Sequence, residues 1–264
     1  MLKRILTLLL ISLLSLPSYA GHTLVLIHGY LSDGNAWRSS GIVQALQPAG
    51  WLDAGHLFPN APEHGGIVPT SLKRYIYTVT LPSEAPLAVQ AQWLDFYLRH
   101  LRIRHPDNSL ILVGHSAGGV LARLVMVVSD IPIQGLITIA SPHLGTDKAE
   151  LGTGLSNSPF GWVAPFLGLD TINRSKGLYR DLTRESPATL LFWLNRQPHP
   201  KAFYVSIVRV GGDQWVAPYS QDMNDVPALR GLAMTVNSVG KHSLQSTDGP
   251  LLGPLLAKLL KFKK

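Results

Sequence analysis

The run Ser109-Leu-Ile-Leu-Val-Gly-His-Ser-Ala-Gly-Gly119 decides how the rest of the chain is interpreted. Its first half is apolar, which is typical of a strand buried in a parallel sheet. Residues 117–128 then follow a helical pattern. Small residues flank Ser116, where larger side chains would collide in a tight turn. The run therefore predicts a sharp strand-to-helix turn that lifts the Ser116 hydroxyl clear of the sheet edge and places the next backbone N–H at a helix start.

Strand and helix patterns alternate along the chain. Apolar and β-branched runs predict strands at 23–27, 51–58, 74–80, 109–113, 135–140 and 202–210. Helical patterns occupy residues 36–46, 86–104, 117–128, 187–195 and 251–262. This alternation predicts an α/β fold with a mostly parallel central sheet and helices on both faces. Since no internal repeat or long linker interrupts the pattern, we expect a single domain over residues 21–264.

The first 20 residues follow the pattern of a secretory signal peptide. Lys3 and Arg4 precede an apolar stretch of 12 residues, Ile5–Leu16. Pro17 ends that stretch, and Ser18-Tyr-Ala20 supplies small residues at a cleavage site. We therefore expect residues 1–20 to be removed and the protein to be periplasmic or secreted. The alternative is an uncleaved N-terminal anchor.

Composition limits the classes of partner and cofactor. The formal charge of +7 falls to +5 when Lys3 and Arg4 are removed (7 − 2 = 5). No dense basic stripe with interleaved aromatic residues occurs, so nucleic-acid binding is not indicated. The chain has no cysteine, and its histidines lack a metal-ligand spacing such as H-E-x-x-H. We expect neither a metal nor a cofactor, while the basic residues at 258–264 leave contact with a membrane surface open.

Ser116 needs partners before it can act as a nucleophile. A serine hydroxyl requires a base within hydrogen-bond reach, a carboxylate that orients the base, and N–H donors for an oxyanion. In a strand–turn–helix arrangement of this type, the acid and then the histidine follow the serine on later loops. Asp213 comes directly after the 202–210 strand and is the predicted acid, with Asp222 and Asp225 as rivals. His242 is the only histidine after Asp213 and is the predicted base.

Two backbone N–H groups are the predicted oxyanion donors. One belongs to Ala117, directly after the serine, and the other to Tyr30, in the loop after the first strand. Gly29 precedes Tyr30 and permits close approach of the backbone to a substrate. For His28 we expect a structural role, as a buried side chain bonded to the backbone.

Residues after the 135–140 strand are candidates for the wall of a pocket. His143 and Leu144 follow that strand and are predicted to line the site. Residues 144–200 combine glycine, proline and serine with large apolar side chains, which is typical of a lid that exposes apolar surface when it opens. The alternative is that these side chains simply pack on the sheet.

Taken in order, these motifs resemble those of the serine lipases and esterases of the α/β-hydrolase superfamily, and they are similar to bacterial triacylglycerol lipases. The segments that carry the resemblance are Leu26–Tyr30, Val113–Gly119, Ile139–Gly145, Asp181–Pro187, Gly212-Asp213 and Lys241-His242. The resemblance implies an acyl-enzyme at Ser116 and an ester or lipid substrate. Ser243–Ser246 stands where larger secreted members carry a calcium-binding aspartate, so no calcium is expected there.

Several functions remain compatible with the sequence. Cleavage of carboxylic esters is the leading hypothesis. An amidase, a thioesterase or an acyltransferase would use the same three side chains. A non-catalytic lipid-binding or interaction module on this scaffold is the remaining alternative, and the sequence does not decide whether a folding partner is needed.

Overall fold

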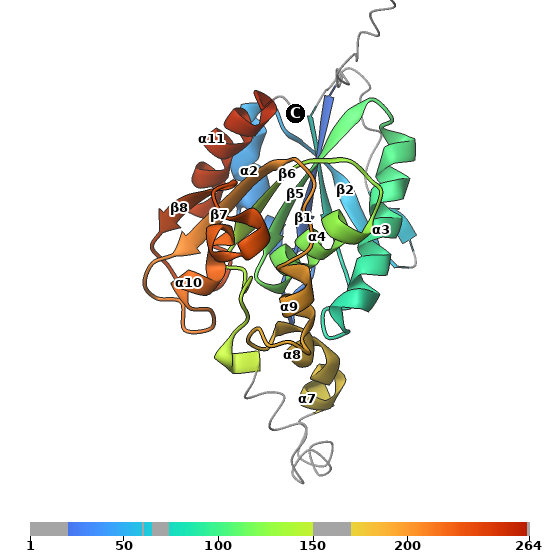
Figure 1. Ribbon diagram of the computed structural model, residues 1–264. Helices are drawn as coiled ribbons and strands as arrows, with labels where there is room; N and C mark the ends of the chain where they lie inside the picture. The colour runs from blue at the N-terminus through green and yellow to red at the C-terminus, as the bar shows by residue number, and fades with distance from the viewer. Residues whose placement is uncertain (1–20, 60, 65–73, 150–169, 263–264) are drawn as a thin grey trace, which may run out of the picture.

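The computed structural model describes residues 21–59, 61–64, 74–149 and 170–262, so the signal-peptide prediction lies outside it. Within these ranges the chain forms an eight-stranded sheet with the order β3-β2-β4-β1-β5-β6-β7-β8 (Figure 1). Neighbouring strands are parallel except for the antiparallel pair β2–β3 at one edge. The strands are β1 (Gly21–Ile27), β2 (Leu52–Phe58), β3 (Ala61–His64), β4 (Arg74–Val79), β5 (Asn108–His115), β6 (Ile133–Ile139), β7 (Phe203–Arg209) and β8 (Ala233–Ser238).

Helices cover both faces of the sheet, as the predicted α/β fold requires (Figure 1). The α-helices are α1 (Ala36–Ser39), α2 (Ile42–Leu46), α3 (Leu87–Arg104), α4 (Ala117–Val128), α7 (Asp170–Arg174), α8 (Lys176–Leu182), α9 (Leu190–Leu194), α10 (Pro218–Gln221) and α11 (Asp248–Leu260). Short 3₁₀ turns lie at Gln47–Ala49, Met223–Asp225 and Pro227–Leu229. No helix among the described residues is long and apolar enough to cross a bilayer.

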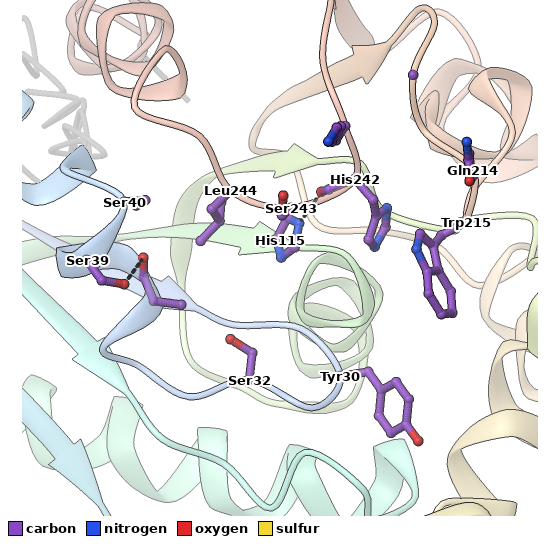
Figure 2. Close-up of a pocket in the computed structure, with 13 residues that line it drawn as sticks. Tyr30, Ser32, Ser39, Ser40, His115, Gln214, Trp215, His242, Ser243 and Leu244 are labelled. Atoms are coloured by element: carbon purple, nitrogen blue, oxygen red, sulfur yellow. Dashed lines mark hydrogen bonds between the residues drawn. The ribbon is translucent and has the colours of Figure 1, made fainter.

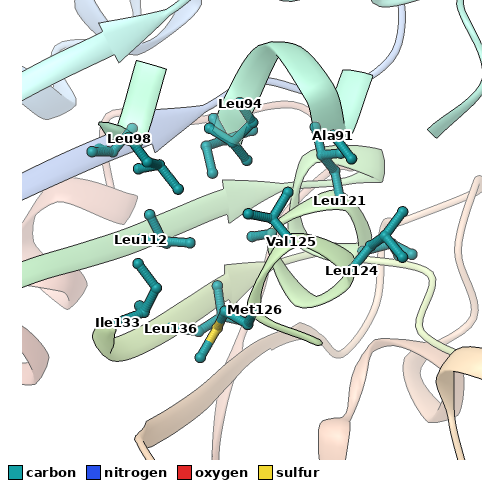
Figure 3. Packing of buried hydrophobic residues seen from close by; sticks show 14 of the residues in the cluster. Ala91, Leu94, Leu98, Leu112, Leu121, Leu124, Val125, Met126, Ile133 and Leu136 are labelled. Carbon is teal, nitrogen blue, oxygen red and sulfur yellow. The ribbon is translucent and has the colours of Figure 1, made fainter. Parts of the chain in front are cut away.

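Two apolar clusters sandwich the sheet because successive side chains of a strand point to opposite faces. On one face, Leu94 of α3 and Val125 of α4 pack with Leu112 of β5 (Figure 3). On the other face, Val113 of β5 packs in the cluster that holds Leu256 of α11. Each fully buried side chain of this size contributes about 1.5–3 kcal/mol from removal of apolar surface from water. The central strands β1 and β5 are therefore fixed on both faces, and the site is built at the ends of such strands.

The structure departs from the predicted elements at the edge strands of the sheet and in the bounds of two helices. The predicted 36–46 helix is interrupted at Gly41, whose φ of +80° is left-handed and ends α1 before α2 starts. The edge strands β3 and β8 were not predicted. Edge strands carry weaker apolar patterns, and in β8 the sequence Ala-Met-Thr-Val-Asn-Ser is only partly buried. The last helix begins at Asp248, three residues before the predicted start.

Part of the predicted lid segment packs on the core. Residues 150–169 lie outside the described ranges, and residues 170–200 form α7, α8 and α9, of which α8 contacts α3, α7 and α9. Leu191 and Leu194 of α9 are fully buried in the cluster that contains α3, whereas Trp193 is 42% exposed. For the described part, α8 and α9 therefore contribute to the packed core.

Candidate active site

Ser116 occupies a strained turn between β5 and α4. Its φ of 53° and ψ of −129° are rarely adopted by residues other than glycine. The Ser116 N–H donates to the Ile139 carbonyl at 2.9 Å, which ties the turn to β6. A Cβ added at Gly114 would lie 2.5 Å from the Gly119 Cα, and one added at Gly29 would lie 2.8 Å from the Ser116 Cβ. Glycines at these positions let three backbone segments meet around the serine.

The structure brings the predicted serine, histidine and aspartate into one hydrogen-bonded chain. His242 Nε2 lies 2.8 Å from Ser116 Oγ, and His242 Nδ1 lies 2.9 Å from Asp213 Oδ2. The Asp213 side chain is 1% exposed and that of His242 is 18% exposed. Asp213 follows β7 and His242 follows β8, so parallel strands deliver both side chains to the edge of the sheet where β5 ends.

Asp213 sits in a shell of donors that keeps it ionised. Burial of the carboxyl acts to raise its pKa, but the hydrogen bond and charge interaction with His242 and the two backbone N–H donors hold the pKa below its usual value. Those N–H groups belong to Trp215 and Val216, at 2.8 and 3.0 Å from Oδ1. The Gln221 amide donates to Oδ2 at 3.1 Å. An ionised, fixed carboxylate favours the tautomer of His242 that carries its proton on Nδ1.

His115 fixes the backbone of the loop that carries the histidine. Its Nε2 lies 2.7 Å from the His242 carbonyl, so the ring N–H donates there. Burial, followed by repulsion from His242, lowers the pKa of His115 to about 4, which keeps its ring neutral. Its position directly before the serine was the one available signal that it contacts the site.

A buried ion pair links the two loops, and sequence reasoning did not find it. Arg209 ends β7, just before the Asp213 loop, and Asp248 begins α11, just after the His242 loop. Their side chains are both fully buried and meet at 2.7 Å. Arg209 also donates to the Ser238 hydroxyl at 2.9 Å, at the end of β8. The only sequence signal was a charge at a strand end and another at a helix start, a pattern that is common on exposed surfaces.

A largely apolar cavity of about 400 Å³ opens at Ser116. Its apolar wall is formed by Leu31, Ala117, Pro142, Ala149, Leu178, Leu182 and Val216. Tyr30, His115, Trp215 and His242 also line it, and the same four residues line a second, more polar groove of about 700 Å³ (Figure 2). The hydrogen-bonded chain therefore stands where two compartments of different polarity meet.

The residues predicted to supply oxyanion donors, Tyr30 and Ala117, both line the cavity beside Ser116. The Tyr30 hydroxyl is bonded to the hydroxyls of Tyr179 at 2.6 Å and Ser175 at 3.0 Å, which anchors its loop to α8. His28 is buried and bonded to the Gly29 carbonyl and the Leu81 N–H, in agreement with the structural role expected for it.

The structure corrects the prediction that His143 and Leu144 line the pocket. His143 is fully buried, with Nδ1 at 3.1 Å from Arg123 and Nε2 at 3.1 Å from Thr138, and burial holds its pKa well below the usual value. Leu144 packs against the core cluster. The chain turns inward after β6, so the neighbours Pro142 and Thr146 reach the cavity instead.

The described part of the chain holds no group of three or more histidine or acidic side chains arranged to bind a metal ion. The side chains that the structure brings together beside the apolar cavity are those of a serine, a histidine and a carboxylate.

A sequence profile described as the alpha/beta hydrolase family matches residues 24–260, which is most of the chain. The chain belongs to the alpha/beta hydrolase family. Among curated proteins, no sequence matches it significantly. This hydrolase-family chain is similar in fold to a gene product of Listeria innocua, with 17% identity, a TM-score of 0.62, and coverage of 92% of this chain and 96% of the other.

Two further solved structures have the same fold as this hydrolase-family protein. The mature form of the Bacillus licheniformis lipase BlEst2 is 18% identical with a TM-score of 0.55, over 94% of this chain and 95% of that one. The thioesterase RedJ of the prodiginine pathway in Streptomyces coelicolor is 17% identical with a TM-score of 0.50, over 91% of this chain and 87% of that one. At these identities the likeness establishes the fold.

Proposed function

We propose that this protein is an exported serine hydrolase that cleaves carboxylic esters. The observation that carries the proposal is the hydrogen-bonded chain from Ser116 through His242 to Asp213, at the mouth of an apolar cavity. Membership of the alpha/beta hydrolase family supports it. A lipase among the proteins of similar fold is consistent with an ester or lipid substrate.

In the first half of the proposed reaction, His242 Nε2 takes the hydroxyl proton as Ser116 Oγ attacks the ester carbonyl carbon. The negative charge that develops on the carbonyl oxygen is stabilised by the N–H groups of Tyr30 and Ala117. His242 then gives its proton to the alkoxy oxygen of the leaving alcohol. The C–O bond to the alcohol breaks, and the acyl group remains on Ser116.

In the second half, water attacks the acyl-enzyme while His242 takes one of its protons. The same N–H groups stabilise the second oxyanion, and collapse of that intermediate releases the carboxylic acid. The proton on His242 returns to Ser116 Oγ, so the enzyme is regenerated. Asp213 remains ionised throughout, because it orients the imidazole and stabilises the imidazolium without accepting the proton.

The rim of the cavity supports access from a lipid surface. Leu31 and Trp215 line the cavity, yet they are 60% and 57% exposed. Large apolar side chains exposed around a cavity mouth favour contact with an apolar phase. Residues 1–20 would direct export to the periplasm or the medium, and the basic residues near the C-terminus would add attraction to anionic membranes.

The proposal is tested with the mature protein and its Ser116→Ala variant. We expect the wild type to cleave p-nitrophenyl esters and to be labelled by a fluorophosphonate, and the variant to do neither. Acyl-matched thioesters and anilides, assayed in parallel, would reveal a thioesterase or an amidase through a higher kcat/KM. Wild-type protein that neither hydrolyses any of these compounds nor reacts with the fluorophosphonate would favour a non-catalytic module.

A further inference from the structure

The polar groove of about 700 Å³ beside His242 takes no part in the proton transfers and acyl transfer at Ser116 (Figure 2). We propose that it binds the alcohol part of the substrate, and that this alcohol is hydroxylated and carries an anionic group such as a phosphate. The inference rests on the proposed ester hydrolysis at Ser116 and specifies the substrate class of that same site.

The geometry of the reaction assigns the two compartments to the two parts of an ester. Ser116 and Ala117 line the apolar cavity, so the acyl chain that becomes attached to Ser116 extends there. Neither residue lines the polar groove, whereas His242 lines both compartments. Since His242 must deliver a proton to the leaving oxygen, the alcohol lies on the side of the histidine that faces the groove.

One part of the groove offers hydrogen-bond acceptors. The Ser39 hydroxyl donates to the Ala36 carbonyl at 3.3 Å, and the Ser40 hydroxyl donates to the Trp37 carbonyl at 3.2 Å. A hydroxyl has one hydrogen and two lone pairs, so these two oxygens remain available as acceptors. Acceptors of this kind bind the O–H groups of a glycerol or sugar moiety and offer nothing to an apolar alcohol.

The rest of the groove offers a positive charge and neutral donors. Lys241 lines the groove directly before His242, and among the described residues its ammonium has no carboxylate partner. Ser32, Ser243 and Gln214 add side chains that can donate hydrogen bonds. None of the described residues that line the groove is an aspartate or a glutamate. An unpaired ammonium in a groove without negative charge favours an anion.

The first test measures binding without catalysis. Glycerol 3-phosphate, glycerol and inorganic phosphate are titrated by calorimetry into the mature wild type, Lys241→Gln, Lys241→Arg and Lys201→Gln. Lys201 is an exposed lysine outside the groove, so its variant is the matched control for loss of one charge. We expect glycerol 3-phosphate to bind more tightly than either fragment, and Lys241→Gln to weaken that binding about fivefold. Lys241→Arg and Lys201→Gln should retain it.

The second test measures selectivity with esters that share an octanoyl chain. Their alcohols are glycerol 3-phosphate, glycerol and ethanol, and all are used below their micelle concentrations. We expect kcat/KM to be highest for the anionic ester, and the ratio of its kcat/KM to that of the glycerol ester to fall about fivefold in Lys241→Gln. A parallel assay on vesicles that contain a long-chain phosphatidate separates a lipid source of the anionic ester from a soluble one.

The outcomes separate this inference from the proposed function. Equal kcat/KM for the three esters, or a ratio that does not respond to Lys241→Gln, would overturn the groove assignment and leave ester hydrolysis intact. Absence of hydrolysis, together with Lys241-dependent binding of glycerol 3-phosphate, would overturn ester hydrolysis and retain the anion site. Binding of glycerol 3-phosphate that is equal in all four proteins would show that the anion binds elsewhere.

Discussion

The turn that carries Ser116 and the loops that carry Asp213 and His242 are held by different kinds of contact. The serine turn is fixed by close backbone packing at Gly29, Gly114, Gly118 and Gly119, where β1, β5 and α4 meet. The acid and base loops are fixed by polar contacts between residues far apart in the chain, such as His115 with the His242 carbonyl and Arg209 with Asp248. The comparison shows that close backbone packing and a backbone hydrogen bond to β6 place the nucleophile, whereas a few separable side-chain contacts place the base.

The largest effect should come from removing the charge that orients the base. Asp213→Asn keeps the size of the side chain but cannot hold His242 in the required tautomer. We expect kcat to fall about 10⁴-fold for esters, with little change in the unfolding midpoint. The control is Asp222→Asn, at the rival aspartate, whose carboxylate bonds to Asn224 and Thr235 away from His242, and it should leave kcat within about twofold. A larger kcat loss in the Asp222 variant would reassign the acid.

Breaking the buried ion pair should be the next largest effect. Asp248→Asn leaves the Arg209 guanidinium buried without a counter-charge, and we expect a loss of about 3–5 kcal/mol in the free energy of unfolding by urea. The double variant Arg209→Met/Asp248→Leu should recover much of that loss, because no uncompensated charge remains. If the double variant stayed as stable as wild type but lost kcat, the pair would be shown to position the loops.

A larger residue in the turn that carries Ser116 tests whether close backbone packing fixes the nucleophile. In Gly118→Ala the new methyl would lie 2.7 Å from the Ile27 carbonyl oxygen and closer still to that of His28. We expect about 1–3 kcal/mol of destabilisation and a fall in kcat. Gly231→Ala is the control, because nothing lies within 4 Å of its added Cβ and only its φ of +75° opposes the change. That variant should lose about 1 kcal/mol of stability and keep its kcat.

Lowering the pH should reduce the free energy of unfolding through protonation of His115, which holds the loop of His242. Its folded pKa of about 4 lies below the usual histidine value near 6.5, so between these values the unfolded chain binds more protons. Its contribution to stability is complete above pH 6.5 and is lost as the pH falls toward 4, by about 3 kcal/mol at most. His115→Gln retains a donor to the His242 carbonyl without titrating. Between pH 6.5 and 4, the free energy of unfolding by urea should therefore fall less steeply in the variant than in the wild type. His143 and His199, whose pKa values are also lowered, keep part of this pH dependence in both proteins.

The smallest effect is expected from the Tyr30 hydroxyl, whose hydrogen bonds only support the loop that carries the Tyr30 N–H donor. Tyr30→Phe removes the hydroxyl that bonds Tyr179 and Ser175 but keeps the Tyr30 N–H. We expect a loss of about 1 kcal/mol in stability and a decrease in kcat/KM of about threefold to fivefold. A 100-fold decrease in kcat/KM would mean that the position of the Tyr30 loop also depends on a single polar contact.

The sequence predicted the central strands of the sheet and the Ser116 turn better than it predicted the edge strands. The apolar runs of β1 and β5 and the glycines around Ser116 have local signatures, because strands buried on both faces and tight turns restrict residue types strongly. The edge strands β3 and β8 were missed, since partial exposure relaxes that restriction. His143 was misplaced for a related reason. Its position after β6 was correct, but the inward turn of the chain depends on contacts with Arg123 and Thr138.

The sequence by itself determined the α/β architecture, the strained turn at Ser116 and the order in which an acid and a histidine follow it, because each depends on residues that are neighbours in the chain. Only the tertiary structure decided that Asp213 and not Asp222 meets His242, that Arg209 and Asp248 join the two loops, and that an apolar cavity and a polar groove meet at the histidine. These features require contacts between segments tens of residues apart, and such contacts leave no periodic or local pattern in a single sequence.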